Sequence, residues 1–184
     1  MSRLISAALF LLGCLFIGQG GYMDAKASLS QVLIDHAWDS RAAQSRPNRP
    51  WWWADTRPVA QMVVPRLNKR VYVMQDSSGE SLAFGPGHMN GSAQPATDGH
   101  VLIAGHRDSH FAFLGDVEIA DVIETTHYNK SKKRYRVTDI RIIDIRYDDL
   151  TLLEHNALTL ITCYPLDSIV PNGPERLLVN AVEI

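Results

Sequence analysis

Cysteine is scarce in this chain, which contains only Cys14 and Cys163 among its 184 residues. Cys14 lies in an apolar N-terminal stretch, so the rest of the chain holds one thiol. That excludes an internal disulfide framework and a cysteine-based zinc cluster. Cys163 ends the apolar β-type run Leu158-Thr159-Leu160-Ile161-Thr162-Cys163, and Tyr164-Pro165 follows it. A lone cysteine on an apolar strand is usually a small buried hydrophobe, so its neighbours decide whether it has a chemical use.

An excess of charge of either sign is also missing. Lysine and arginine total 18, aspartate and glutamate total 20, and the formal net charge is −2. This balance provides no overall attraction to nucleic acid, and we expect no nucleic-acid partner. One basic cluster stands out, and we interpret it as a solvated hairpin turn. Its members are Lys130, Lys132, Lys133, Arg134 and Arg136.

Long apolar runs are absent except at the N-terminus, where residues 4–17 carry no charge and follow Arg3. The run is shorter than the ~20 residues that a membrane-spanning helix needs, but the uncharged residues 18–22 extend it. Three fates stay open. The run is an uncleaved signal anchor, a signal peptide cleaved after Ala25-Lys26-Ala27, or a lipoprotein signal at Cys14, although apolar residues follow that cysteine. Arg3 ahead of the run favours a cytoplasmic N-terminus and a periplasmic remainder.

A helical pattern is predicted over residues 25–45, where Leu29, Val32 and Leu33 recur at helical spacing. The prolines of residues 46–50 break it. Three adjacent tryptophans follow at residues 51–53, and two interpretations compete for them. They plug the joint between helix and domain, or they form an interfacial belt at lipid headgroups. The length of helix between them and the apolar run favours the plug.

Beyond residue 59 the pattern changes to short runs rich in Val, Ile, Leu, Thr and Tyr, separated by Gly, Pro, Asn and Asp. About seven or eight such strands with little helix between them favour a closed or nearly closed β-barrel. The expected strands are 59–64, 71–74, 101–104, 121–126, 135–145, 157–163 and 177–184. We therefore expect a mainly β protein in three parts. These are a signal anchor or signal peptide (1–22), a membrane-proximal helix and linker (23–50) and a β-barrel domain (51–184).

Three chemically useful side chains lie near the ends of these predicted strands. Cys163 closes one strand, Arg176 opens the next, and His106 follows the run Val101-Leu102-Ile103-Ala104-Gly105. A cysteine, a histidine and an arginine suggest a nucleophile, a base and an anion stabiliser.

The same segments resemble the sortases, the cysteine transpeptidases that attach proteins at bacterial surfaces. The resemblance rests on Thr-Leu-Ile-Thr-Cys at 159–163, Gly-His at 105–106 and Arg176, and it runs from about Trp38 to Ile184. Residues 50–56, 82–88 and 104–108 look more narrowly like the Gram-negative class GN sortases. The resemblance implies a closed eight-stranded β-barrel with an N-terminal helix and membrane anchor, and it favours the uncleaved anchor. We expect a single-pass inner-membrane protein with its catalytic domain in the periplasm.

The resemblance also implies the chemistry. The enzyme is expected to cleave a C-terminal Leu-Pro-any-Thr-Gly-like sorting signal of a protein substrate and transfer the acyl group to an amine acceptor. Cys163 would attack, His106 would move protons, and Arg176 would stabilise the oxyanion. Two alternatives use the same fold: a periplasmic cysteine peptidase that hydrolyses the acyl-enzyme, and a non-catalytic barrel that binds peptide tails.

Two residues near the predicted nucleophile and base are expected to support them. By its place in the family motif, Thr162 is the expected backbone or hydroxyl donor beside the nucleophile, and Asp108 either orients His106 or satisfies loop amides. His106 and His110 have the i, i+4 spacing of a helical metal pair, but Gly105 and the preceding strand argue against a helix. We expect no metal and no cofactor. Three further histidines, to which we assign no role, are expected on the surface or in loops: His88, His100 and His127.

Overall fold

The computed structural model describes residues 2–40, 47–168, 170 and 173–184. Eight strands occur among these residues. They are β1 (Pro58–Val64), β2 (Lys69–Met74), β3 (Gly87–His88), β4 (His100–Ala104), β5 (Val122–His127), β6 (Lys132–Asp144), β7 (Ala157–Cys163) and β8 (Glu175–Glu183). The helices are α1 (Ser2–Asp39) and α2 (Gly79–Phe84), with 3-10 turns η2 (Pro65–Leu67) and η3 (Ala112–Asp116).

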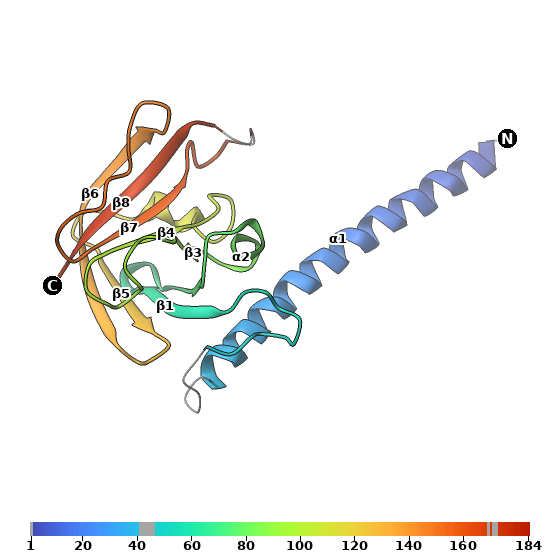
Figure 1. Ribbon diagram of the computed structural model, residues 1–184. Helices are drawn as coiled ribbons and strands as arrows, with labels where there is room; N and C mark the ends of the chain where they lie inside the picture. The colour runs from blue at the N-terminus through green and yellow to red at the C-terminus, as the bar shows by residue number, and fades with distance from the viewer. Residues whose placement is uncertain (1, 41–46, 169, 171–172) are drawn as a thin grey trace.

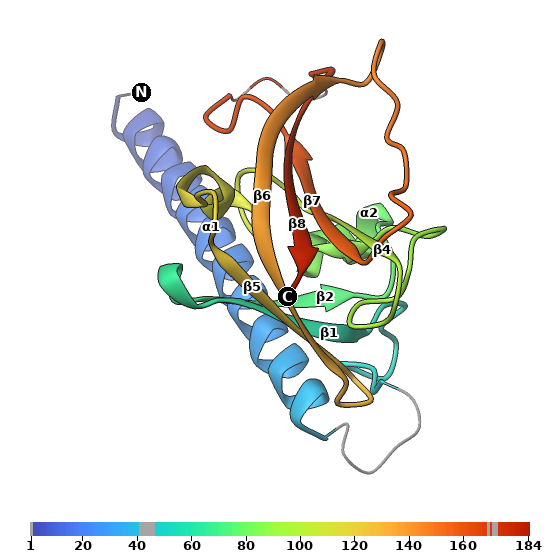
Figure 2. The same cartoon turned by 90° about the vertical axis from the view of Figure 1, so that its left-hand side faces the viewer.

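The strands close into a barrel in the order β1-β2-β3-β4-β7-β8-β6-β5, which confirms the predicted closed eight-stranded barrel (Figures 1 and 2). Most neighbours are antiparallel, but β2 with β3 and β4 with β7 are parallel. The parallel β4–β7 pair matters for the site, because parallel strands bring their carboxyl ends to the same edge of a sheet.

Side-chain alternation divides β7 between the two faces of the barrel wall. Leu158 and Leu160 belong to the main core, together with the fully buried rings of Phe111 and Tyr135. Thr159, Ile161 and Cys163 therefore share the outer face. The nucleophile candidate stands on the outside of the barrel, where a substrate can reach it.

Helix α1 joins the apolar N-terminal run and the predicted helix into one element that projects away from the barrel (Figure 1), and residues 41–45 of the predicted helix lie outside the described residues. Only its C-terminal part packs on the domain. Ile34, Ala37 and Trp38 are buried there, and the Trp38 ring lies 5.7 Å from that of Tyr72. The Tyr72 hydroxyl also donates to Asp35. Over the residues that the structure describes, no helix meets the length and hydropathy needed to span a membrane.

The three adjacent tryptophans have different environments. Trp51 is half-buried, and its ring meets that of Phe84 edge-on at 5.0 Å. Trp52 and Trp53 are 84% and 62% exposed, so the plug interpretation is wrong for these two. The chain folds back after α1, and Trp53 lines a groove together with Tyr22 and other residues of the helix.

Two short elements were not predicted. Strand β3 contains only 2 residues, and α2 contains 6. Neither is long enough for a periodic pattern to reveal it. The basic cluster does follow the β5–β6 hairpin tip, but Lys133 is not a freely solvated residue. It pairs with Asp98 at 2.7 Å and with Glu183 at 2.8 Å.

Candidate active site

The parallel pairing of β4 with β7 brings His106 and Cys163 to one edge of the barrel. Ala104 pairs with Ile161, and the Gly105 N–H donates to the Ile161 carbonyl at 3.0 Å. His106 and Cys163 each lie two residues beyond a member of that last pair. Because the strands run in the same direction, both side chains leave the sheet at its carboxyl edge. Cys163 is a free, half-buried thiol.

The turn that carries His106 requires glycine before it. A Cβ atom on Gly105 would lie 2.7 Å from Cδ2 of Phe111, closer than real side chains approach. Phe111 is fully buried, and its N–H donates to the His106 carbonyl at 2.9 Å. The ring therefore fills the space beside Gly105 and closes the turn over residues 106–111. This contact explains the Gly-His pair on physical grounds.

Arg176 lies opposite the nucleophile candidate across the antiparallel β7–β8 ladder, where it is the register partner of Cys163. Its Nη1 donates to the carbonyls of Gly173 at 2.6 Å and Glu175 at 2.8 Å. These two bonds brace the guanidinium against its own loop. In the part of the chain that the structure describes, Nε and Nη2 make no hydrogen bond, so donors remain for an anion.

Thr162 is buried, and its hydroxyl donates to the Gly105 carbonyl at 2.8 Å. The hydroxyl hydrogen is therefore engaged in tying the end of β7 to the turn that carries His106. This geometry assigns Thr162 the positioning of the two strand ends, not the donation of its hydroxyl proton to a substrate.

Asp108 makes no hydrogen bond to His106 within the described residues. Its charge acts instead on His110, where burial lowers the pKa, the Ala83 backbone and Asp108 oppose that effect, and His106 adds to it. The structure thus gives Asp108 no orienting contact with the candidate base. His110 lies in the turn over residues 107–110, not on a helix with His106.

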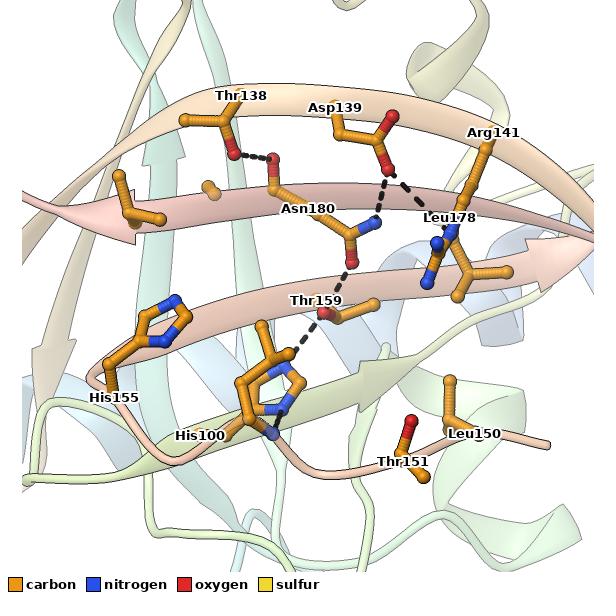
Figure 3. Close-up of a pocket in the computed structure, with 13 residues that line it drawn as sticks. His100, Thr138, Asp139, Arg141, Leu150, Thr151, His155, Thr159, Leu178 and Asn180 are labelled. Carbon is orange, nitrogen blue, oxygen red and sulfur yellow. Dashed lines mark hydrogen bonds and ion pairs between the residues drawn. The ribbon is translucent and has the colours of Figure 1, made fainter.

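The outer face of the sheet extends from Cys163 toward the opposite edge. Its middle is apolar, formed by Leu102, Ile161 and Leu178. Beyond it lies a pocket of about 280 Å³ on β4, β6, β7 and β8, walled on one side by residues from the β6–β7 loop (Figure 3). Nucleophile, apolar patch and pocket thus follow one another on one face.

The prediction that His88, His100 and His127 are surface or loop residues is wrong. Their exposed fractions are only 2%, 6% and 5%. They lie on strands, where alternation turns a side chain toward the core or toward a covered face. For His100 a signal was available, because it precedes Leu102 by two residues and so shares that residue's face.

A thiol, an imidazole and a guanidinium at adjoining strand ends of a closed barrel define the class of protein: a β-barrel with a candidate cysteine-centred active site. Comparisons with known proteins agree. The family model described as the sortase domain matches residues 62–184. Sortase D of Bacillus subtilis is 23% identical over 194 residues, covering 97% of each chain.

Solved structures show the same fold. Sortase A from Corynebacterium diphtheriae aligns with a TM-score of 0.62 at 22% identity, covering 84% of each chain. Sortase C1 from Streptococcus agalactiae aligns with a TM-score of 0.60 at 26% identity, covering 69% of each chain. The chain belongs to the sortase family. Members of this family are cysteine transpeptidases, so the protein is an enzyme that acts on peptide bonds.

Proposed function

We propose that this protein is a membrane-anchored sortase of class GN, which cleaves a C-terminal Leu-Pro-any-Thr-Gly-like sorting signal and transfers the product to an amine. The observation that carries the proposal is the strand register. Pairing of β4 with β7 and of β7 with β8 gathers His106, Cys163 and Arg176 from three separate segments. The non-catalytic alternative does not explain this gathering.

The reaction begins at the Cys163 thiol. Its thiolate attacks the scissile carbonyl carbon, and the carbonyl oxygen becomes an oxyanion. His106 in its imidazolium form donates a proton to the departing amine, the C–N bond breaks, and a thioester remains. An incoming amine then attacks the thioester, gives a proton to His106, and releases the Cys163 sulfur as the new amide forms. Arg176 contributes its unused N–H groups to each oxyanion.

The outer face supports a peptide as the substrate. A substrate peptide whose scissile carbonyl reaches Cys163 can extend along the outer face of β7, past Ile161 and Thr159. The apolar patch of Leu102, Ile161 and Leu178 suits the apolar and proline residues of such a signal. The β6–β7 loop walls the far end.

Two features support the membrane anchor. Residues 4–17 are uncharged, and Leu9, Phe10, Leu15 and Phe16 of α1 are 64–72% exposed. The exposed Trp53 ring lines a groove on the helix together with Tyr22, where that run ends, and the exposed Trp52 ring meets the Trp53 ring edge-on at 4.9 Å. Tryptophan and tyrosine at this level are typical of a membrane interface. The proposed location is the inner membrane, with the barrel in the periplasm.

The nucleophile is tested with Cys163→Ala. Wild-type protein should form a covalent adduct with a sorting-signal peptide that carries a thiol-trapping group, and the mass of the adduct should map to Cys163. The variant should form none while keeping its melting temperature, because a small half-buried side chain is lost. Labelling that persists in the variant, at Cys14 or elsewhere, contradicts the assignment.

Two further measurements test the transfer to an amine and the membrane anchor. Adding an amine to the acyl-enzyme should yield the amide as the main product, whereas hydrolysed peptide alone would favour the peptidase alternative. The full chain expressed in a Gram-negative host should stay with the membrane after an alkaline carbonate wash, and external protease should reach the barrel in spheroplasts. Release by carbonate would contradict the anchor without bearing on the chemistry.

A further inference from the structure

The β6–β7 loop, residues 145–156, is attached to the barrel at very few points. Its first part closes back on itself around Asp144, and its last residue, Asn156, bonds to Gly99 and Glu183. Between these ends, the described residues 149–155 make one hydrogen bond. The Leu153 N–H donates to Nδ1 of His100 at 2.9 Å.

That bond begins a chain of hydrogen bonds whose directions are all determined. Because Leu153 donates to Nδ1, this nitrogen carries no proton, and the neutral ring holds its proton on Nε2. Nε2 then donates to the Thr159 hydroxyl at 2.8 Å, which donates to Asn180 Oδ1 at 2.7 Å. Asn180 Nδ2 donates to Asp139 at 2.8 Å (Figure 3). The chain crosses β4, β7, β8 and β6 and ends on a carboxylate.

Every donor in this chain faces an acceptor only while His100 is neutral. A second proton, on Nδ1, would point at the Leu153 N–H, and the two donors would repel each other. Residues 149–155 would then lose the one hydrogen bond that joins them to the barrel, whereas the bond from His100 to Thr159 would remain. His100 is 6% exposed, so it cannot rotate outward to relieve the conflict without disturbing its strand.

We propose that neutral His100 is a positioning residue that holds the β6–β7 loop closed as the wall of the pocket, and that protonation of His100 releases the loop. The release itself stands without the proposed function. Its consequence for peptide binding rests on that function, because the pocket continues the face that leads to Cys163.

The charged groups around His100 indicate the pH range. His155 approaches from the loop, and Asp139 and Arg141 from β6 line the same pocket. Asp98, two residues earlier in the chain, is paired with Lys133. Burial lowers the pKa of His100, and the positive charge that His155 can carry lowers it further. The neutral, closed form therefore persists at and above about pH 6.5, the ordinary histidine value, and is lost only as the pH falls below it.

Two substitutions separate the two ring nitrogens. His100→Asn places an amide oxygen near the position of Nδ1, so it keeps an acceptor for Leu153 but cannot titrate. His100→Gln places an amide nitrogen near the position of Nε2, so it keeps the donor to Thr159 and loses the acceptor for Leu153. Both variants retain a polar, uncharged side chain of similar size at the start of β4. They differ in which half of the chain of hydrogen bonds they preserve.

The test measures the full chain in lipid nanodiscs. Long-range ¹H–¹⁵N spectra should show the Nε2–H tautomer of His100 at pH 7.5. Hydrogen exchange of the Leu153 amide, corrected for the intrinsic pH dependence, should accelerate roughly three- to tenfold in His100→Gln, the scale of one hydrogen bond. The wild type should show the same acceleration in acid, and His100→Asn should not. The Ala157 amide, which bonds to Gly99 at 3.3 Å, is the internal control.

A fluorogenic Leu-Pro-Glu-Thr-Gly peptide extends the test to binding. His100→Gln should raise KM with little change in kcat, and His100→Asn should restore a KM near the wild-type value. Any of three results would overturn the proposal. They are an Nδ1–H tautomer of His100, unchanged exchange of the Leu153 amide in His100→Gln, and an acceleration of that exchange in acid that persists in His100→Asn. If the wild type leaves this peptide uncut, the proposed substrate is at fault, and the exchange data still decide on the loop.

Discussion

Gly105 shows how a residue without a side chain can position a candidate catalytic residue, His106. The fully buried Phe111 ring occupies the space that a Cβ atom would need, and Thr162 holds the Gly105 carbonyl from the other side. The backbone that leads into His106 is thereby enclosed between a rigid ring and the strand that carries Cys163.

Gly105→Ala should therefore both destabilise the barrel and slow acylation. Overpacking of this kind costs about 1–3 kcal/mol, which corresponds to a melting temperature lower by roughly 2–12 °C in a protein of this size. Gly79→Ala is the matched control, because no atom lies within 4 Å of the added methyl group. A Gly105→Ala enzyme with unchanged melting temperature and rate would show that the turn adapts freely.

Arg176 is the residue whose role can be separated from its contribution to the fold. If its free N–H groups stabilise the oxyanion, Arg176→Ala should lose about 10²–10³-fold in acylation rate. Arg176→Lys should recover little, since an ammonium cannot reproduce the fork of donors. The melting temperature should change little, because the hydrogen bonds of the guanidinium to described residues all go to its own loop and strand start. Normal kinetics with a lowered melting temperature would make Arg176 a structural residue.

Helix α1 lies in two environments, since its N-terminal part is exposed and its C-terminal part packs against the barrel. Its C-terminal part buries Ile34 and Trp38 against the barrel, and the chain that follows turns back to place Trp52 in solvent. Two tryptophans of the same segment thus differ in burial from 2% to 84%. Their different burial allows a test of how firmly the helix is joined to the domain.

Trp38→Ala should destabilise the full chain by about 3–5 kcal/mol, the usual cost of emptying a buried aromatic site. The expected fall in melting temperature is roughly 6–20 °C. Trp52→Ala should stay within about 0.5 kcal/mol of the wild type, as exposed substitutions do. Thermal unfolding of both variants in the same detergent checks this. Equal destabilisation would mean that the packing of α1 on the barrel contributes nothing.

At the scale of the whole molecule, the proposed mechanism uses only side chains of the protein. Among the described residues, no cluster of three or more His, Cys, Asp or Glu side chains is arranged to hold a metal ion. Activity on a sorting-signal peptide should therefore survive prolonged treatment with EDTA. A loss that zinc or calcium restores would reveal a site assembled outside these residues.

Much of the site could be predicted because it lies at the ends of strands with strong local signals. The bounds of β7 agree with the prediction residue for residue, since Ala157–Cys163 is a continuous β-type run closed by Tyr164-Pro165. Strand β3 could not be predicted, because two residues carry no periodicity and its pairing with β2 and β4 is entirely non-local.

The sequence by itself determined the closed β-rich class, the lone thiol and the family motifs, because these depend on residue types and short spacings along the chain. Only the tertiary structure decided which residues face one another. It buried His100 beneath the β6–β7 loop, engaged the Thr162 hydroxyl with Gly105, and brought Trp53 back beside Tyr22. These contacts join segments tens of residues apart, and their geometry depends on strand register and loop path, which no local pattern encodes.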